Sequence, residues 1–330
     1  MALISTSSHD AAALLNKNDI VAIPTETVYG LAGNAFSEKA IKKIFELKKR
    51  PFYNPLIVHI KSVADLNQIA TEIPAKAMLL ADAFWPGPLT LVLKRQSTIP
   101  DLVTAGKNTV AVRVPNHPIT LALLEQLDFP LAAPSANPFG SISPTKAQHV
   151  ADYFTESSLT VLEGGECRSG IESTIIGFED GSAVLYRLGS ITIEEIENVI
   201  GPLKIKTNNE KTPSAPGMLS KHYAPKTKTI LTETVTEELK LFDTKRIGLL
   251  TYQNHFEHKN IVTNEVLSAT GDLAEAASRL YNALHKLDQL KLDVIIAEKF
   301  PDHGLGRTIN DRLERATKKQ THPKKQTTQQ

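Results

Sequence analysis

The sequence predicts an α/β protein with a large sheet, followed by a linker and a smaller α/β unit. Three observations support this prediction. Short apolar runs alternate with amphipathic helical patterns over the first two thirds of the chain, which is typical of a sheet covered by helices. A polar, proline-containing stretch at 204–225 interrupts the alternation. The alternation then resumes over a shorter length, so a second unit is expected.

Strands of the first unit are expected where apolar residues follow one another, at 20–23, 56–60, 89–93, 109–114, 131–133, 173–178 and 183–188. Ser37 is expected to cap a helix that stops near Arg50, because the proline that follows disfavours helical geometry in the residue before it. Ser62 is expected to open another helix together with Asp65. The stretch 192–200 is expected to be the last helix of this unit, ended by Gly201.

The linker at 204–225 carries Pro213, Pro216, Gly217 and Pro225, so we expect it to resist helix and sheet. After it, a strand at 246–252, a helix carrying the apolar stripe from 273 to 287, a strand at 294–297 and a short helix at 307–317 are expected. The resulting domain boundaries are 1–203, 204–225 and 226–317. The polar tail at 318–330 is expected to be disordered.

Composition excludes several classes of function. The chain of 330 residues has 37 Lys and Arg against 36 Asp and Glu, so any nucleic-acid contact would need a local basic patch. One cysteine excludes a disulfide framework and a multi-cysteine zinc site. The N-terminal residues do not read as a signal peptide, and no apolar window approaches the length of a membrane span. We therefore expect a cytoplasmic protein.

Common catalytic and nucleotide-binding motifs are absent from the sequence: it contains no GxGxxG, GxxxxGK[ST], HExxH or GxSxG. Cys167 is interpreted as a small loop residue rather than a nucleophile.

Polar stretches instead follow the expected strands, where open α/β sheets bind ligands. The stretch Pro24–Gly30 reads equally well as a capped turn or as a ligand loop. The basic residues at 48–50 either complement a helix end or clamp phosphate. His59 taken alone is more typical of a hydrogen-bonded core histidine. Arg187 in an apolar strand is costly unless it is paired or binds an anion. Together these basic and polar side chains favour a phosphate-transfer reaction that depends on substrate positioning and charge stabilisation.

Seven strings in order, IPTETVYGL, LKKRPFYNPLIVHI, FWPGPLTLVL, TVAVRVPNHP, APSANPFGSISPT, GIESTII and APGMLSKHYAP, resemble the threonylcarbamoyl-AMP synthase family. The later GLGRTINDRLERA is similar to the C-terminal domain of its long members. The resemblance implies a YrdC-like twisted open sheet with flanking helices and a Rossmann-like C-terminal domain. It also implies synthesis of L-threonylcarbamoyladenylate from L-threonine, bicarbonate and ATP, with release of pyrophosphate, for threonylcarbamoyladenosine modification of tRNA.

The resemblance also implies roles for particular residues. Threonine would be held by Thr27, His59, Arg113, the backbone of Ala133, and Ser173. ATP would be held by Arg50, Asn54, Thr109, Ser135, Ser143, Arg187 and Tyr223, with Lys48 as a further phosphate contact. Thr109 and Arg113 are four apart in a strand and therefore face the same side.

No residue is expected to act as acid, base or nucleophile, and Arg50 and Arg187 would stabilise charge. Magnesium would be carried on the ATP phosphates without a protein ligand, and no organic cofactor is expected. The linker would fold over the site and bring Tyr223 to the nucleotide. Departures from the family pattern are minor: GLAGNA stands where GLGANA is frequent, and Lys49 where Gly or His is frequent.

Two alternatives remain at this point. A double-stranded RNA- or tRNA-binding protein without catalysis would use the basic residues between Lys39 and Arg50 and the basic tail. A carbamoyl-phosphate enzyme similar to hydrogenase-maturation proteins would share the YrdC-like domain, but those chains also carry cysteine-rich zinc segments. Beyond ATP, L-threonine and bicarbonate, tRNA or threonylcarbamoyl-transferase proteins are possible partners, and no membrane partner is expected.

Overall fold

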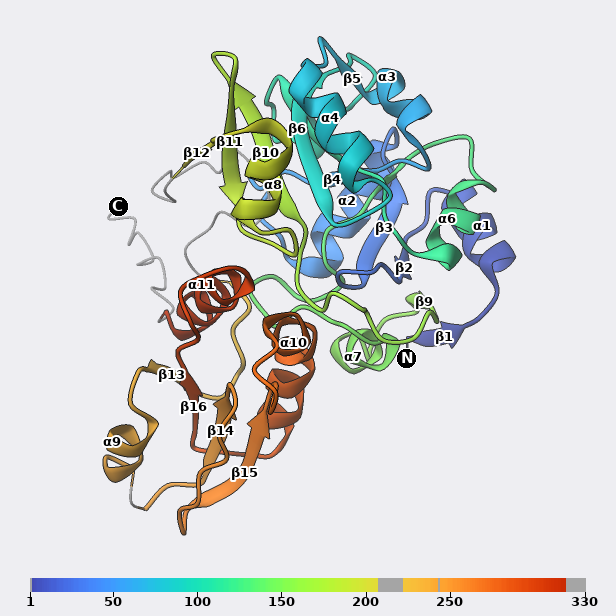
Figure 1. Ribbon diagram of the computed structural model, residues 1–330. Helices are drawn as coiled ribbons and strands as arrows, with labels where there is room; N and C mark the ends of the chain where they lie inside the picture. Colours follow the sequence, from blue (N-terminus) through green and yellow to red (C-terminus); the bar gives the residue numbers. More distant parts are fainter. Residues whose placement is uncertain (1, 207–221, 243, 319–330) are drawn as a thin grey trace, which may run out of the picture.

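The computed structural model describes residues 2–206, 222–242 and 244–318. Within them the chain forms a large mixed sheet and a small parallel sheet, each with its own helices (Figure 1). The expected α/β class, with a large unit followed by a smaller one, is confirmed. No helix among these residues is long and apolar enough to cross a membrane.

The large sheet has the strand order β1-β9-β2-β3-β8-β4-β7-β6-β10-β11-β12, with β5 paired to β6. Its strands are β1 (Leu3–Ser5), β2 (Val21–Ile23), β3 (Gly30–Asn34), β4 (Ile57–His59), β5 (Ala70–Thr71), β6 (Leu89–Arg95), β7 (Thr109–Arg113), β8 (Leu131–Ala132), β9 (Thr160–Leu162), β10 (Thr174–Glu179), β11 (Ser182–Arg187) and β12 (Lys204–Ile205). All seven strands expected in this region are present. The structure adds β1, β3, β5, β9 and β12, which are short or contain glycine and polar residues.

The helices beside this sheet are α1 (Ser8–Asn16), α2 (Glu38–Lys48), η1 (Val63–Asp65), α3 (Leu66–Ile69), α4 (Ala75–Phe84), α5 (Asp101–Thr104), α6 (Pro118–Leu124), α7 (Ala147–Tyr153) and α8 (Ile193–Ile200). Ser37 caps α2 as expected, since its side chain accepts from the Ala40 N–H. Ser62 differs from expectation: its hydroxyl donates to the Asp65 carboxylate at 3.0 Å, and only a 3-10 turn and a four-residue helix follow.

The small sheet is fully parallel, with the order β13-β16-β14-β15. Its elements are β13 (Thr229–Thr232), α9 (Val235–Lys240), β14 (Ile247–Thr251), β15 (Ile261–Val266), α10 (Leu273–Gln289), β16 (Val294–Glu298) and α11 (Leu305–Thr317). Residues of α9 pack with one face of the sheet, through Val235 and Leu239. Residues of α10 and α11 pack with the other face.

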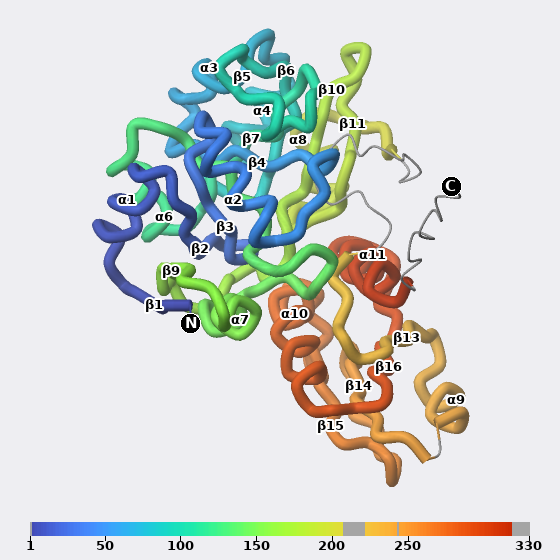
Figure 2. Tube along the Cα trace, turned by 180° about the vertical axis from the view of Figure 1, so that it is seen from behind, coloured from blue at the N-terminus to red at the C-terminus, as the bar shows by residue number. Residues whose placement is uncertain are grey.

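The face that carries α10 and α11 is turned toward the large unit (Figures 1 and 2). Val28, Ile142 and Ile171 of the large unit share one buried apolar cluster with these two helices. The approach is closest at Gly170, whose φ is +67° and where a Cβ would lie 2.2 Å from the Ser278 carbonyl oxygen. Only glycine fits this position, so the two units are closely packed there.

The expectation that residues 204–225 resist sheet is wrong at both described ends. Residues Lys204–Ile205 form β12, parallel to β11, and Ala224 forms a bridge with Ser141. Backbone groups at a free sheet edge favour such pairing. The linker residues Pro213, Pro216 and Gly217, and nearly all of the tail at 318–330, lie outside the described residues.

Candidate functional site

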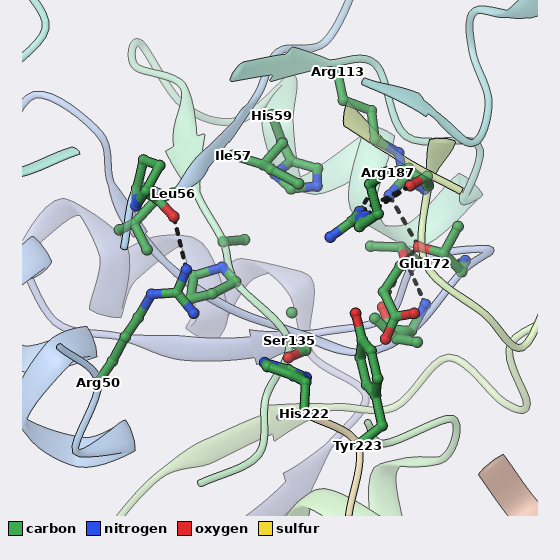
Figure 3. Close-up of a pocket in the computed structure, with 18 residues that line it drawn as sticks. Arg50, Leu56, Ile57, His59, Arg113, Ser135, Glu172, Arg187, His222 and Tyr223 are labelled. Atoms are coloured by element: carbon green, nitrogen blue, oxygen red, sulfur yellow. Dashed lines mark hydrogen bonds between the residues drawn. The ribbon is translucent and has the colours of Figure 1, made fainter. Parts of the chain in front are cut away.

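A cavity of about 60 Å³ lies beside the central strands of the large sheet (Figure 3). Arg50 stands on one side of it, and Arg113 and Arg187 stand on the other. Half of the lining comes from segments that follow or end strands, and much of the rest comes from segments that lead into strands. The lining residues are Thr25, Thr27, Val28, Gly30, Arg50, Pro55, Leu56, Ile57, His59, Arg113, Ala133, Pro134, Ser135, Glu172, Ser173, Arg187, His222 and Tyr223.

The loop after β2 is shaped by the Thr25 hydroxyl. This oxygen donates to the Val28 carbonyl at 2.6 Å and accepts from the N–H groups of Thr27 and Val28 at 3.1 and 3.2 Å. The two readings of this stretch are therefore compatible, because the loop satisfies its own backbone groups and also lines the cavity. The bonds fix the Thr27 side chain at the cavity wall.

Arg113, at the end of β7, is held on three sides. Its NH1 donates to Thr27 Oγ1 at 2.9 Å and its Nε donates to the Gly87 carbonyl at 3.1 Å. Its NH2 lies 2.6 Å from Glu26 Oε1, and both side chains are 4% exposed. The Glu26 carboxylate is itself fixed by the Asn116 N–H at 3.0 Å. A buried guanidinium held this firmly presents its fork in one orientation.

His59 lies opposite Arg113 in the register of β4 and β7. Burial, helped by the nearby Arg113 charge, lowers the pKa of His59 to about 3, so the ring is neutral at pH 7. Its Nδ1 atom is buried without a hydrogen-bond partner among the described residues. The ring is therefore more than a satisfied core histidine, since one nitrogen is available to a ligand.

Arg50 follows α2, whose C-cap residue Lys49 adopts the left-handed conformation with φ 53°. The Arg50 guanidinium donates to the carbonyls of Asn54 and Pro55 at 3.1 and 2.7 Å. Burial, together with the Arg187 charge, lowers the pKa of Arg50 to about 9. Among the described residues no carboxylate forms a salt bridge with it, so a buried cation faces the cavity without an anionic partner.

Arg187 and Ser173 form a second polar group. Arg187 donates through Nε and NH2 to the Ser173 carbonyl at 3.1 and 2.9 Å, and through NH2 to Ser173 Oγ at 3.0 Å. The Ser173 hydroxyl also shares a 2.7 Å hydrogen bond with Thr90. Gly189 allows this arrangement, because a Cβ there would lie 2.2 Å from the Thr174 nitrogen. Burial lowers the pKa of Arg187, as expected for a desolvated cation.

Tyr223 closes one side of the cavity (Figure 3). The residue is 1% exposed, and its hydroxyl has no hydrogen-bond partner among the described residues. Its φ of 64° lies in the left-handed region, which is unfavourable for tyrosine unless its surroundings hold it. The adjacent His222 ring also lines the cavity, and burial lowers its pKa to about 3.

Glu172 was not among the predicted site residues, although it lines the cavity. Its carboxylate accepts from Ser143 Oγ at 2.7 Å, from Tyr281 OH at 2.9 Å and from Arg312 Nε at 2.8 Å. Burial raises the pKa of Glu172, but Arg312 and Arg187 outweigh that effect and hold it at about 2. Tyr281 and Arg312 come from α10 and α11. Arg312 lies within the GLGRTINDRLERA string, but no local pattern indicates that either residue meets Glu172.

Nine of the thirteen predicted site residues line the cavity: Thr27, Arg50, His59, Arg113, Ala133, Ser135, Ser173, Arg187 and Tyr223. Four do not. Lys48 Nζ donates to the carbonyls of Ser135 and Asn137, so it holds that loop instead of facing the cavity. The Asn54 side chain is buried and both of its polar atoms lack partners in the described structure. Ser143 is bonded to Glu172.

Thr109 lies apart from this cavity, and its expected contact with ATP stays a prediction. Thr109 and Arg113 belong to the same strand, but Thr109 is the exposed first residue of β7, whereas Arg113 is its buried last residue. A strand rises about 3.3 Å per residue, so four residues separate the two positions along the sheet by more than the reach of either side chain. Side-chain alternation gives a shared face but not a shared cavity.

The arrangement can bind a ligand with several negative charges. Arg50, Arg113 and Arg187 line one cavity. The carboxylate in its wall, Glu172, is paired with Arg312, and Glu26, which lies behind the wall, is paired with Arg113. Among the residues that the structure describes, no group of three His, Cys, Asp or Glu could hold a metal ion. Cys167 is buried, and burial raises its pKa, which is unfavourable for a nucleophilic thiolate.

Comparisons with known proteins give a consistent result. A family model described as telomere recombination matches residues 13–189, and one described as the C-terminal domain of threonylcarbamoyl-AMP synthase matches residues 191–317. The chain is 42% identical to threonylcarbamoyl-AMP synthase of Pyrococcus abyssi over 93% of each chain. It is 43% identical to that of Bacillus subtilis over 93% of this chain and 91% of the relative. The solved structure of P. abyssi Sua5 complexed with L-threonine is similar, with a TM-score of 0.89, 39% identity and coverage of 96% of this chain and 97% of that chain.

Proposed function

The chain belongs to the threonylcarbamoyl-AMP synthase family, and we propose that the cavity between Arg50 and Arg113 is where it makes threonylcarbamoyl-AMP. The chain is a nucleotidyltransferase of tRNA modification. Its substrates are L-threonine, bicarbonate and ATP. The main support for this location is the environment of Arg50. Its buried guanidinium donates only to backbone carbonyls among the described residues. A buried cation of this kind is stabilised when an anion binds it.

The half of the cavity around Arg113 binds threonine. The Arg113 fork suits the amino-acid carboxylate, and its bonds to Glu26, Thr27 and Gly87 fix its orientation in advance. The free Nδ1 of His59 and the Ser173 hydroxyl are polar groups within the same wall and suit the threonine hydroxyl and amine. Backbone groups at Ala133 complete this half.

The half of the cavity around Arg50 binds the ATP phosphates. Arg50 and Arg187 are both desolvated cations, and the Tyr223 hydroxyl is a buried donor that lacks a partner in the described structure. Ser135 lies on a loop that Lys48 fixes through two backbone carbonyls. Lys48 therefore acts on the nucleotide indirectly, by holding this loop.

The reaction follows from this placement. The threonine amine attacks the bicarbonate carbon, the new N–C bond forms, and water leaves, which gives the N-carboxylate, a carbamate. A carbamate oxygen attacks the α-phosphorus of ATP in line, the bond from this phosphorus to the α,β-bridging oxygen breaks, and pyrophosphate leaves with that electron pair. Arg50 and Arg187 offset the negative charge that develops on the phosphate oxygens. Catalysis then depends on positioning and charge stabilisation, without a protein nucleophile.

Magnesium fits this site as a companion of the ATP phosphates rather than as a protein-held ion. Mg²⁺ prefers phosphate and water oxygens with one or two carboxylates. Glu26 and Glu172 are engaged by Arg113 and Arg312, which leaves the phosphates as the ligands. When bound there, the ion would add positive charge on the triphosphate.

His222 and Tyr223 move when substrates enter. Ligand sites for molecules of this size usually enclose about 300–1,000 Å³, whereas the cavity encloses about 60 Å³ with these two side chains in its wall. These two residues at the described end of the linker therefore act as a cover that opens for ATP and threonine and closes to exclude water from the adenylate; residues 207–221 of the expected lid lie outside the described residues.

The non-catalytic RNA-binding alternative is weaker because its basic surface is interrupted. Lys48 and Arg50 are buried, and Lys43 bonds Asp19 at 2.8 Å. Lys42 lies 3.6 Å from Glu38, so acidic partners also offset part of the exposed positive charge of α2, whereas nucleic-acid binding relies on a basic patch.

Pyrophosphate release from ATP tests the proposal. We expect release only when both threonine and bicarbonate are present. Release that is independent of either substrate, or formation of ADP in place of pyrophosphate, would contradict the proposed reaction.

A further inference from the structure

Two side chains from the second domain reach the wall of the cavity. Arg312 of α11 is 1% exposed, and its guanidinium donates to Glu172 Oε2 at 2.8 Å and to the Leu188 carbonyl at 2.6 Å. Tyr281 of α10 donates its hydroxyl to the same carboxylate. Both contacts cross from the small unit to the large one.

The same two side chains hold the ring of Tyr223. The guanidinium carbon of Arg312 lies 4.9 Å from the centre of the Tyr223 ring. The Tyr281 ring is stacked on the Tyr223 ring, with 5.7 Å between centroids and 29° between planes. Together with the left-handed backbone of Tyr223, these contacts explain how its hydroxyl is kept at the cavity.

Arg312 also neutralises a negative charge in the wall of the cavity. Glu172 is a buried carboxylate in the wall of a cavity that receives phosphates. Without Arg312 it would repel them, and a buried charge left without its partner is strongly unfavourable. Arg312 therefore neutralises an anion and fixes a hydrogen-bond donor, both on the nucleotide side of the cavity.

We propose that Arg312 and Tyr281 are positioning residues through which the second domain completes the ATP-binding half of the catalytic centre. This inference rests on the proposed function. The threonine half, around Arg113 and His59, receives no described hydrogen bond from α10 or α11. The second domain is therefore required for nucleotide use and is not only an anchor for the linker.

Steady-state kinetics of the full-length protein tests this inference. We expect Arg312→Met to raise KM for ATP roughly 10- to 100-fold, since a cation–π contact and a charge-assisted hydrogen bond are lost, while KM for threonine changes less than threefold. Arg312→Lys should recover part of the loss, because the charge remains but the fork does not. Tyr281→Phe, which keeps the stacked ring and loses only the hydroxyl, should raise KM for ATP less than Arg312→Met.

Thr308→Val is the matched control. Thr308 lies on α11 and donates to the Gly189 carbonyl at 3.0 Å, so it crosses the same interface and has no described hydrogen bond to Glu172 or Tyr223. We expect this variant to keep the wild-type KM for ATP even if its thermal stability falls. If Thr308→Val raised KM for ATP and KM for threonine as much as Arg312→Met does, Arg312 would be only an interface contact, and the inference would be wrong.

A double-mutant cycle with Tyr223→Ala isolates the coupling. Because Arg312 acts on Tyr223 as well as on Glu172, Arg312→Met should raise KM for ATP by a clearly smaller factor in the Tyr223→Ala background than in the wild-type protein. Full additivity of the two effects would overturn the inference. If Arg312→Met does not fold, Arg312→Lys and Tyr281→Phe decide the question in the same assay. A wild-type protein that releases no pyrophosphate would refute the proposed function instead, so the two failures are distinct.

Discussion

Replacing Arg50 by methionine should separate activity from stability. In the proposed complex the Arg50 fork makes two charge-assisted hydrogen bonds to phosphate. Such bonds contribute about 1.5–3 kcal/mol each, so their loss should lower kcat/KM for ATP roughly 10²- to 10⁴-fold. Arg50→Lys should restore only part of this, because an ammonium lacks the bidentate geometry.

The folded protein should tolerate the change, because two effects oppose each other. Burial lowers the pKa of Arg50 to about 9, so the charged guanidinium is less favourable in the folded than in the unfolded chain, and removing it relieves that cost. Against this, the carbonyls of Asn54 and Pro55 lose their donors, which costs about 1–3 kcal/mol. The melting temperature should therefore shift by only a few degrees.

Pyrophosphate release and thermal unfolding, measured on the same preparations with and without ATP, check this prediction. ATP should raise the melting temperature of the wild-type protein and have little effect on Arg50→Met, since a ligand stabilises only the protein that binds it. A folded Arg50→Met protein with near-normal turnover would refute the assignment of the phosphate site.

Three further predictions concern Tyr223, the choice of amino acid and the two buried histidines of the cavity. Tyr223→Phe should weaken ATP use about tenfold without loss of thermal stability, because the hydroxyl is buried without a partner in the described structure; unchanged ATP kinetics would exclude it as a donor. Valine should be used roughly ten- to a hundred-fold less efficiently than threonine, because it leaves unpaired the polar groups that are placed for the hydroxyl. Serine keeps the hydroxyl and should be used better than valine. Equal use of valine and threonine would contradict this prediction. His59 and His222 have pKa values near 3 in the fold, below the ordinary value of about 6.5. The unfolded chain therefore binds protons that the folded chain does not. Stability should be complete above pH 6.5 and fall toward pH 3, and a urea midpoint that stays constant over this interval would contradict the assignment.

Local patterns were enough to predict the central elements of the fold. The apolar runs that became β2, β4, β6, β7, β8, β10 and β11 could each be read without tertiary information. Ser37 was recognised as a cap because the capping residue and the first helical turn are adjacent in sequence. Strands β1 and β9 carry only three residues each, which gives no periodic signal; β1 is an edge strand with mostly exposed residues, and β9 lies between β1 and β2.

The candidate site was predictable where residues follow strands and not where they cross the domain interface. Arg113 and Ser173 stand at strand ends, so the position of the strand located them. Glu172 and Arg312 are 140 residues apart, and only the packing of α11 on the large unit brings them together. Thr109 lies on the expected strand but at the opposite end of β7 from Arg113, so its expected contact with ATP stays a prediction.

The most direct test of the central claim is the fate of ¹³C-labelled bicarbonate, followed by mass spectrometry of the nucleotide product. If the Arg50 and Arg113 halves of the cavity hold ATP and threonine together, the product is an adenylate that contains threonine and one labelled carbon, formed in equal amount to pyrophosphate. The same product should be lost in both Arg50→Met and Arg113→Met. An unlabelled adenylate, or labelled product made at wild-type rates by either variant, would contradict the account.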